Sequence, residues 1–427
     1  MSRTAREAAA QALLAVSQDG GYSNLVLDNI LEKEDLSPAD RSFCAALFYT
    51  AMQRMLTLDH AIAAYSSQPL KKLSPEVLTA LRCGFCQLLF LNVPESAAVN
   101  ETVKLVKSLG EERAAGFVNA VLRSFLRAGC AVPVPKDKLT ALSVQYSVPM
   151  PLIQLWRKGY GHQTAVDILE GMEDAPPLFL RGNTTKTTLE ALVKTLAAEG
   201  CTAQLVPEVP NALRVYAPGG VARLPSFAKG LYHVQDLSSQ RCVLAAGIAP
   251  GMRVLDLCAA PGGKSFTAAQ QLQGRGELLA CDLYDHRLML VEAGARRLGL
   301  QNSITTRQND ATQPNPSLGL FDRVLCDVVC SGFGTLRRKP EIRYKPLETL
   351  DDLPAIQYNI LDSAFVYLGV GGRLIYSTCT LNPAENDQVI KRLLDTRSDV
   401  ALCGAPITIF PTRDGGDGFF YAVLEKR

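Results

Sequence analysis

The stretch that decides the fold is Val254-Leu255-Asp256-Leu257-Cys258-Ala259-Ala260-Pro261-Gly262-Gly263-Lys264-Ser265. An apolar strand here runs into a turn of small residues that opens a helix, so backbone N–H groups can approach a ligand at a helix N-terminus. The turn is not a Walker loop, because Cys258 holds the position of that motif's first glycine. A glycine pair alone is equally typical of a purely structural turn, so the neighbouring strands must decide.

Outward from this turn, short apolar runs alternate with amphipathic helical patterns. This alternation predicts right-handed βαβ units and a parallel sheet, with a nucleotide-type cofactor at the carboxyl ends of the strands. The strands are expected at Arg253–Leu257, Glu277–Cys281, Ile304–Arg307, Phe321–Cys326 and Arg373–Tyr376.

Acidic residues follow three of these strands, namely Asp282, Asp310 and Asp327. A carboxylate about 20 residues beyond a glycine turn is well placed to accept hydrogen bonds from ribose hydroxyls. A single Asp is more often a cap or a turn residue, but three at equivalent strand ends favour a cofactor site.

Two cysteines also follow predicted strands, Cys330 in Asp327-Val328-Val329-Cys330 and Cys379 in Tyr376-Ser377-Thr378-Cys379. A single cysteine is usually a small core residue. In a loop beyond a sheet edge, beside a cofactor pocket, it is a better candidate for a thiolate nucleophile.

The N-terminal third reads as helices. Ser37-Pro38 and Ser74-Pro75 each place an N-cap before a proline at the first helical position, and apolar residues follow at helical spacing. The segment 129–135 cannot continue a helix and predicts a linker. Between about 178 and 217 the pattern is strand, helix, strand, strand, which predicts a small α+β unit.

Composition excludes a disordered or fibrous protein, since 47% of the 427 residues are hydrophobic and 20% are charged. The formal net charge is only +2, so nucleic-acid binding must come from a local patch. With no signal-like start and no apolar run long enough to cross a membrane, we expect a soluble, cytoplasmic protein with reduced cysteines.

Metal binding is not expected. Cys83-Gly84-Phe85-Cys86 has C-x-x-C spacing, but it lies in a predicted amphipathic helix with no second ligand pair, which favours core packing. The four histidines are scattered along the chain.

Taken together, these residues resemble the RNA cytosine-C5 methyltransferases, and most closely the bacterial 16S ribosomal RNA methyltransferases of type B. The resemblance rests on three segments, Asp256 to Lys264, Asp327 to Tyr344, and Tyr376-Ser377-Thr378-Cys379-Thr380-Leu381-Asn382-Pro383-Ala384-Glu385-Asn386. It extends upstream, because Gly116-Phe117-Val118-Asn119-Ala120-Val121-Leu122-Arg123 is similar to part of a NusB-like domain.

The resemblance implies three domains in a monomeric, metal-free enzyme that acts on 16S rRNA. These are an all-α NusB-like RNA-binding bundle (1–140), a linker with a small α+β subdomain (141–235), and a Rossmann-like class I methyltransferase domain that uses S-adenosyl-L-methionine (236–427).

The resemblance also implies roles for single residues. Cys379 is the nucleophile that adds to C6 of cytosine, and Cys330 serves product release. Asp327 lies beside the methyl donor and the base, where it shares the proton needed at N3. The cofactor is expected on Cys258, Ala259, Ala260, Pro261, Gly262, Gly263, Lys264, Asp282 for the ribose, Asp310 for the adenine edge, and Asp327.

One position departs from the family pattern, which usually has Pro immediately before the earlier cysteine, where this chain has Val329. Both cysteines are present, so an active enzyme is expected. The basic segment that follows is expected to contact RNA phosphates around an extruded base, through Arg337, Arg338, Lys339, Arg343 and Lys345.

Two alternatives stay open from the sequence. A cytosine-C5 methyltransferase for tRNA or DNA would share the same motifs. A non-catalytic RNA-binding regulator would keep the NusB-like domain and lose the chemistry, and the two cysteines and three carboxylates argue against it.

Overall fold

A computed structural model describes residues 3–19, 21–413 and 415–427. The chain forms two compact units. The first holds the described residues up to Ala165 together with Leu336–Leu347, and the second holds Val166–Thr335 and Glu348–Arg427. These divisions do not coincide with the domain boundaries expected from the sequence near residues 140 and 235.

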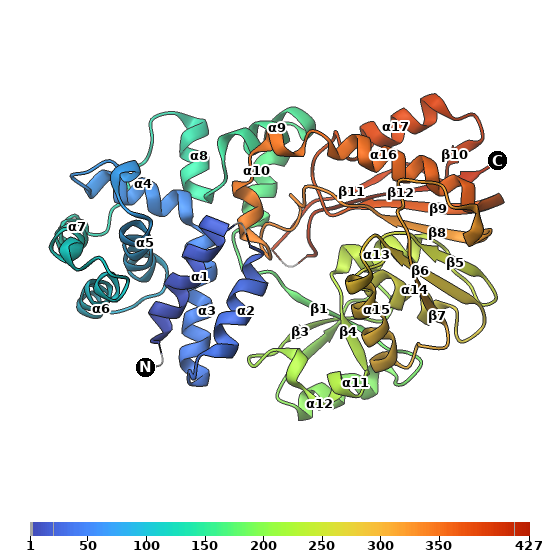
Figure 1. Ribbon diagram of the computed structural model, residues 1–427, viewed down its shortest axis with the longest axis horizontal. Helices are drawn as coiled ribbons and strands as arrows, with labels where there is room; N and C mark the ends of the chain where they lie inside the picture. The colour runs from blue at the N-terminus through green and yellow to red at the C-terminus, as the bar shows by residue number, and fades with distance from the viewer. Residues whose placement is uncertain (1–2, 20, 414) are drawn as a thin grey trace. The chain divides into compact units, whose positions relative to one another are not determined.

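The first unit is an all-α bundle, as predicted (Figure 1). Both expected N-caps form: the Ser37 hydroxyl accepts from the Asp40 N–H at 3.1 Å and the Ser74 hydroxyl from the Val77 N–H at 3.3 Å. The helices are α1 (Ala5–Asp19), α2 (Ser23–Lys33), α3 (Pro38–Gln53), α4 (Met55–Tyr65), α5 (Pro75–Phe90), α6 (Glu95–Ser108), α7 (Ala115–Arg127), α8 (Lys138–Tyr146) and α9 (Met150–Tyr160), while α10 (His162–Gly171) spans the division.

The bundle core is built where the 3.6-residue period placed it. Phe85 on α5 stacks on Phe125 on α7, with ring centroids 4.3 Å apart. Cys83 and Cys86 are fully buried among these apolar side chains, which confirms the core interpretation of the C-x-x-C spacing.

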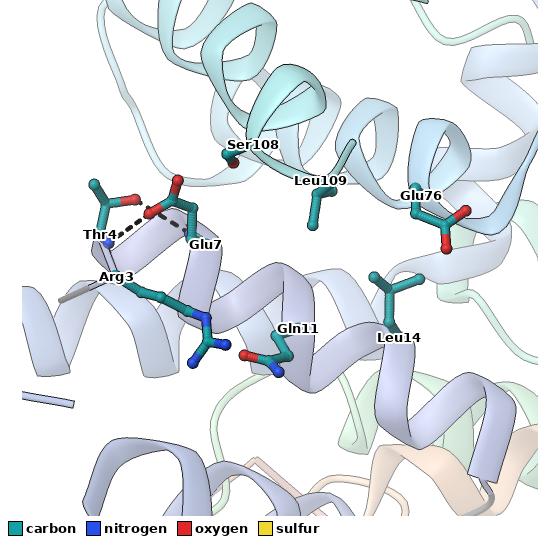
Figure 2. A pocket seen from close by; sticks show the side chains of 8 residues that line it. All are labelled: Arg3, Thr4, Glu7, Gln11, Leu14, Glu76, Ser108 and Leu109. Atoms are coloured by element: carbon teal, nitrogen blue, oxygen red, sulfur yellow. Dashed lines mark hydrogen bonds between the residues drawn. The ribbon is translucent and has the colours of Figure 1, made fainter. Parts of the chain in front are cut away.

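A hollow of about 640 Å³ opens beside α1 in the same unit. Figure 2 shows its wall, in which Thr4 and Glu7 pair across the first turn and Ser108 and Leu109 lie opposite. The Glu7 carboxylate accepts from the Thr4 N–H at 2.7 Å. None of the residues lining this hollow belongs to the expected catalytic or cofactor set.

The small α+β part of the second unit is a four-stranded antiparallel sheet with the order β2-β3-β1-β4. Its apolar face packs on the helix α11 (Leu189–Ala198). The sequence predicted three of its strands and missed the last, and the bounds are β1 (Leu178–Gly182), β2 (Thr202–Leu205), β3 (Ala212–Tyr216) and β4 (Tyr232–Val234).

The large sheet has the order β10-β12-β9-β8-β5-β6-β7, with β11 paired to β12. All five predicted strands are present, and their pairs are parallel. They are β5 (Arg253–Asp256), β6 (Glu277–Asp282), β7 (Ile304–Gln308), β8 (Phe321–Asp327) and β9 (Leu368–Thr378).

The parallel pairing predicted for these five strands is confirmed, and three C-terminal strands that the sequence did not predict extend the sheet in antiparallel pairs. These strands are β10 (Val400–Leu402), β11 (Ile407–Ile409) and β12 (Phe419–Lys426). The sheet is therefore mixed, and β12 pairs with the edge of β9 that is opposite β8.

Helices cover both faces of this sheet (Figure 1). One face carries α13 (Leu237–Ala245), α14 (Gly263–Gln271) and α15 (Asp285–Leu298), and the other carries α16 (Leu353–Ala364) and α17 (Asp387–Thr396). The strand order reverses between β5 and β8, and in doubly wound sheets the ligand crevice lies outside the carboxyl ends of the strands at such a point.

Among the described residues, no helix is both long enough and apolar enough to span a membrane.

Candidate active site

The glycine turn after β5 is shaped by a residue that no other type could replace. Gly262 caps α14 with φ +113°, and a Cβ at this position would lie 2.3 Å from the ring of Phe266. An L side chain would be strained there whatever the space. The turn thus brings backbone close to the carboxyl end of β5, as the sequence predicts.

A buried carboxyl group supports the turn from beneath. Asp256 ends β5 at 1% exposure and accepts from the Ser265 hydroxyl at 2.6 Å. Burial raises its pKa from 3.8 to about 7, although the Ser265 hydrogen bond opposes this shift. Its other oxygen is buried as well, so Asp256 supports the turn from within and is not part of the accessible surface of the site.

A brace on the other side of the turn was missed by the sequence analysis. The Gln235 amide donates to the Gly263 carbonyl at 3.1 Å and accepts from the Thr267 hydroxyl at 2.6 Å. Gln235 lies just after β4, in the part of the chain interpreted only as a subdomain end. No local motif marks it.

Asp282 lies at the end of β6 and is 3% exposed. Its carboxylate accepts from the N–H groups of Ala260 at 3.2 Å and Tyr284 at 3.3 Å, and from Arg287 at 3.2 Å. A carboxylate can accept about four hydrogen bonds, so the turn and Asp282 hold each other while capacity for a hydroxyl remains.

Asp310 follows β7 and differs in its surroundings. Its side chain is exposed and accepts from the N–H and the hydroxyl of Thr312, at 2.9 and 2.7 Å. This is the turn-residue geometry that the sequence analysis weighed as the alternative for a single Asp. Its expected contact with the adenine edge stays a prediction.

Asp327 ends β8 and is held from both sides. The Lys264 ammonium donates to one oxygen at 2.6 Å, and the Ser377 hydroxyl donates to the other at 2.8 Å. Burial opposes the charge of Lys264, but attraction by Asp327 outweighs it and raises the pKa of Lys264 above its ordinary value. The carboxylate is still about one-third exposed, so it faces the crevice.

The two thiols meet beyond the ends of β8 and β9. Cys330 Sγ lies 3.4 Å from Cys379 Sγ, although 49 residues separate them in the chain. Both are partly exposed. The hydrogen bond to Cys379, together with burial, raises the pKa of Cys330 well above its ordinary value, so Cys330 is held as a thiol at neutral pH.

The groups around the crevice fit S-adenosyl-L-methionine. The compound joins a cationic sulfonium to a ribose with two hydroxyls. The strand ends offer the carboxyl groups of Asp282 and Asp327, and a glycine turn that admits a ligand close to the backbone.

The basic segment after Thr335 folds into the first unit rather than lying free. Arg343 is 4% exposed and donates to the carbonyls of Gln53 at 2.7 Å, Ser147 at 3.1 Å and Leu336 at 3.2 Å. Arg337 is 3% exposed. The expected contact with RNA phosphates is therefore wrong for Arg337 and Arg343, because both guanidinium groups are buried, and Arg343 donates to backbone carbonyls of its own unit.

The other cations of this segment remain accessible. Lys339 and Lys345 are exposed, and Arg338 is half-buried. The Lys339 ammonium lies 5.8 Å from the ring centroid of Tyr22. The positive surface of the segment is thus smaller than its composition suggests.

The doubly wound sheet, its glycine turn and the carboxylates at the strand ends define an enzyme with a nucleotide-type cofactor, and the groups of the site fit S-adenosyl-L-methionine. Residues 244–425 match the family model described as 16S rRNA methyltransferase RsmB/F. Residues 3–127 match the NusB family, and residues 148–222 match the ferredoxin-like domain of RsmF/B-like methyltransferases. The chain belongs to the RsmB/F family of methyltransferases.

Curated relatives match over their whole length. The probable ribosomal RNA small subunit methyltransferase B of Synechocystis is 35% identical over 99% of both chains. Ribosomal RNA small subunit methyltransferase B of Escherichia coli O1:K1 is 32% identical over 100% of this chain and 99% of the relative.

Solved structures share the fold. The crystal structure of PH0851 aligns over 100% of both chains with a TM-score of 0.84 at 24% identity. A methyltransferase homologue from Pyrococcus horikoshii aligns over 69% of this chain and 100% of its own, with a TM-score of 0.61 at 26% identity.

Proposed function

We propose that the protein transfers a methyl group from S-adenosyl-L-methionine to C5 of a cytosine in 16S ribosomal RNA, through a covalent adduct between Cys379 and C6. The observation that carries the proposal is the pair of thiols at 3.4 Å, beside the carboxylate of Asp327 at the crevice. Neither a structural turn nor a simple RNA-binding domain requires two partly exposed thiols in contact beyond the carboxyl ends of β8 and β9.

The chemistry explains why a thiol is needed. C5 of cytosine is a poor nucleophile, and addition of a thiolate to C6 makes an enamine whose C5 can attack an electrophilic methyl group. The bound cofactor supplies that methyl as a sulfonium. Loss of the C5 proton then lets the Cys379–C6 bond break, which restores the aromatic ring and frees the thiolate.

The two thiols take different roles in this proposal. Because its pKa is raised, Cys330 is a thiol at neutral pH and can donate its proton toward the sulfur of Cys379. That arrangement favours Cys379 as the group that attacks. Cys330 then serves the elimination step, because its thiol lies next to Cys379 Sγ, whose bond to C6 must break to release the product.

Asp327 completes the site. Addition at C6 places electrons on the ring that protonation at N3 stabilises. The Lys264 ammonium and the Ser377 hydroxyl each bind one oxygen of Asp327, so the orientation of the carboxylate is fixed. Asp327 is proposed to share the N3 proton there.

The substrate proposal follows from the relatives and the accessible cations. The curated relatives are named as methyltransferases of small subunit ribosomal RNA. Arg338, Lys339 and Lys345 are the proposed phosphate contacts, since they are the cations of the basic segment that are not fully buried.

The test is incubation with labelled S-adenosyl-L-methionine and unmodified 16S rRNA, tRNA or DNA, followed by mapping of the product. We expect 5-methylcytosine in 16S rRNA only. Labelling of tRNA or DNA in its place would overturn the substrate, and absence of 5-methylcytosine from every nucleic acid would overturn the reaction. The reaction also requires that Cys379→Ala yields no 5-methylcytosine, and its control is Cys44→Ala, which removes a buried thiol of the helical core.

A further inference from the structure

A buried carboxylate lies behind the two thiols, outside the residues that the proposed reaction uses. Glu385 has no exposed surface. It belongs to the segment after β9, six residues beyond Cys379, yet its carboxylate reaches the loop that carries Cys330.

Both oxygens of Glu385 are bound to groups of the Cys330 loop and its supports. One accepts from the Ser331 hydroxyl at 2.5 Å and from the Asn382 amide at 2.9 Å. The other accepts from the Ser331 N–H at 2.8 Å and from the Gln357 amide at 2.8 Å. All four donors are neutral, so this anion is held by hydrogen bonds and not by an ion pair.

The same network ties the two cysteine loops at further points. The Ser331 hydroxyl also lies 2.6 Å from that of Thr380, which follows Cys379 directly. The Gln357 amide donates to the Val329 carbonyl at 2.9 Å, next to Cys330. The residues flanking each thiol are therefore bound through one buried cluster.

We propose that Glu385 is a positioning residue, which clamps the Cys330 loop against the Cys379 loop and sets the spacing of the two thiols. The inference rests on the proposed two-thiol reaction for its functional meaning. The clamp itself is a statement about the protein alone. Glu385 binds the Cys330 loop through the hydroxyl and the N–H of Ser331, so its proposed effect is on the position of the thiol and not on the base.

The near-isosteric variant Glu385→Gln tests the clamp, because the carboxylate accepts hydrogen bonds at both oxygens, whereas the amide accepts at its oxygen and donates at its NH₂ group. Whichever way the new amide is turned, its NH₂ group faces at least one N–H donor, either the Asn382 amide or both Ser331 N–H and the Gln357 amide. The loop must then move or lose bonds. Ser331→Ala is a milder second variant, which keeps the N–H donor and removes the hydroxyl.

The matched control is Glu199→Gln. Glu199 accepts from the N–H and the hydroxyl of Ser226, at 2.9 and 2.5 Å, which is the same pattern in the small α+β sheet region. Loss of that pattern should leave the thiols and the methylation rate unchanged.

The direct readout is formation of a Cys330–Cys379 disulfide when the RNA-free protein is treated with diamide, followed by mass spectrometry of the linked peptides. The two thiols lose two hydrogens, which the diazene takes up as it becomes a hydrazine. Since a lost buried hydrogen bond of about 1.4 kcal/mol changes a population tenfold, we expect crosslinking to slow at least about tenfold in Glu385→Gln. Ser331→Ala should slow it less, and Glu199→Gln not at all.

The second readout is methylation kinetics. A displaced thiol should lower kcat by about 100-fold with little change in KM for RNA, because a misplacement of about 1 Å costs that much. A Glu385→Gln or Ser331→Ala protein that folds and crosslinks at the wild-type rate would overturn the clamp. If wild-type protein methylates no RNA, the proposed function fails, and the crosslinking rates still decide the clamp.

Discussion

Arg343→Ala should unfold part of the helical unit rather than merely weaken RNA binding. The sequence predicts a phosphate contact here, whereas the guanidinium donates to three backbone carbonyls in the interior of the first unit. Two of these carbonyls end helices, Gln53 at the close of α3 and Ser147 after α8. Both carbonyls are therefore bound by a residue far along the chain, 290 positions from Gln53 and 196 from Ser147.

The magnitude follows from those contacts. Hydrogen bonds from a charged donor are worth about 1.5–3 kcal/mol each. Burial of the charge opposes them, as the lowered pKa of Arg343 indicates. Arg343→Ala leaves three carbonyls without this donor, and an unsatisfied buried acceptor costs about 1–3 kcal/mol. We expect about 3 kcal/mol for Arg343→Ala.

Hydrogen exchange with mass spectrometry measures this loss locally. About 3 kcal/mol corresponds to exchange faster by roughly two orders of magnitude in the peptides that end α3 and α8. Lys345→Ala is the control, since an exposed substitution usually changes stability by less than about 0.5 kcal/mol. The reasoning is refuted if Arg343→Ala leaves exchange unchanged while RNA affinity falls as it does for Lys345→Ala.

Three further outcomes are expected. Cys379→Ala should abolish turnover, whereas Cys330→Ala should let a covalent enzyme–RNA adduct accumulate on denaturing gels; an adduct with the first variant only would reverse the two roles. Gly262→Ala should weaken S-adenosyl-L-methionine binding at least about tenfold by calorimetry, since φ is +113° and the new Cβ meets Phe266; unchanged affinity would contradict the role of the turn. Asp256 has a pKa of about 7 in the folded protein against an ordinary 3.8, so between these pH values the folded state binds more protons than the unfolded state. The contribution of Asp256 to the free energy of unfolding therefore falls as the pH rises through this range, by about 4 kcal/mol as an upper bound. Asp256→Asn should therefore gain stability relative to wild type at pH 8 compared with pH 5, and equal differences in urea unfolding at the two pH values would refute this.

Local pattern was enough for much of the fold. The Ser-Pro caps, the helical periods and the five parallel strands all depend on residues near each other in sequence, and all are present. The direction of β12 could not be read in this way. A strand's apolar run is the same for parallel and antiparallel pairing, and only the path of the connecting chain selects one.

The candidate site, like the fold, has features that the sequence predicts and features that only the structure shows. The sequence by itself placed Cys330, Cys379 and three carboxylates at strand ends, because parallel strands carry their carboxyl ends to one edge. Only the tertiary structure decided that the thiols lie in contact, that Glu385 holds Ser331, and that Arg343 is buried. Burial and pairing of a polar group depend on partners tens to hundreds of residues away, and no local pattern records them.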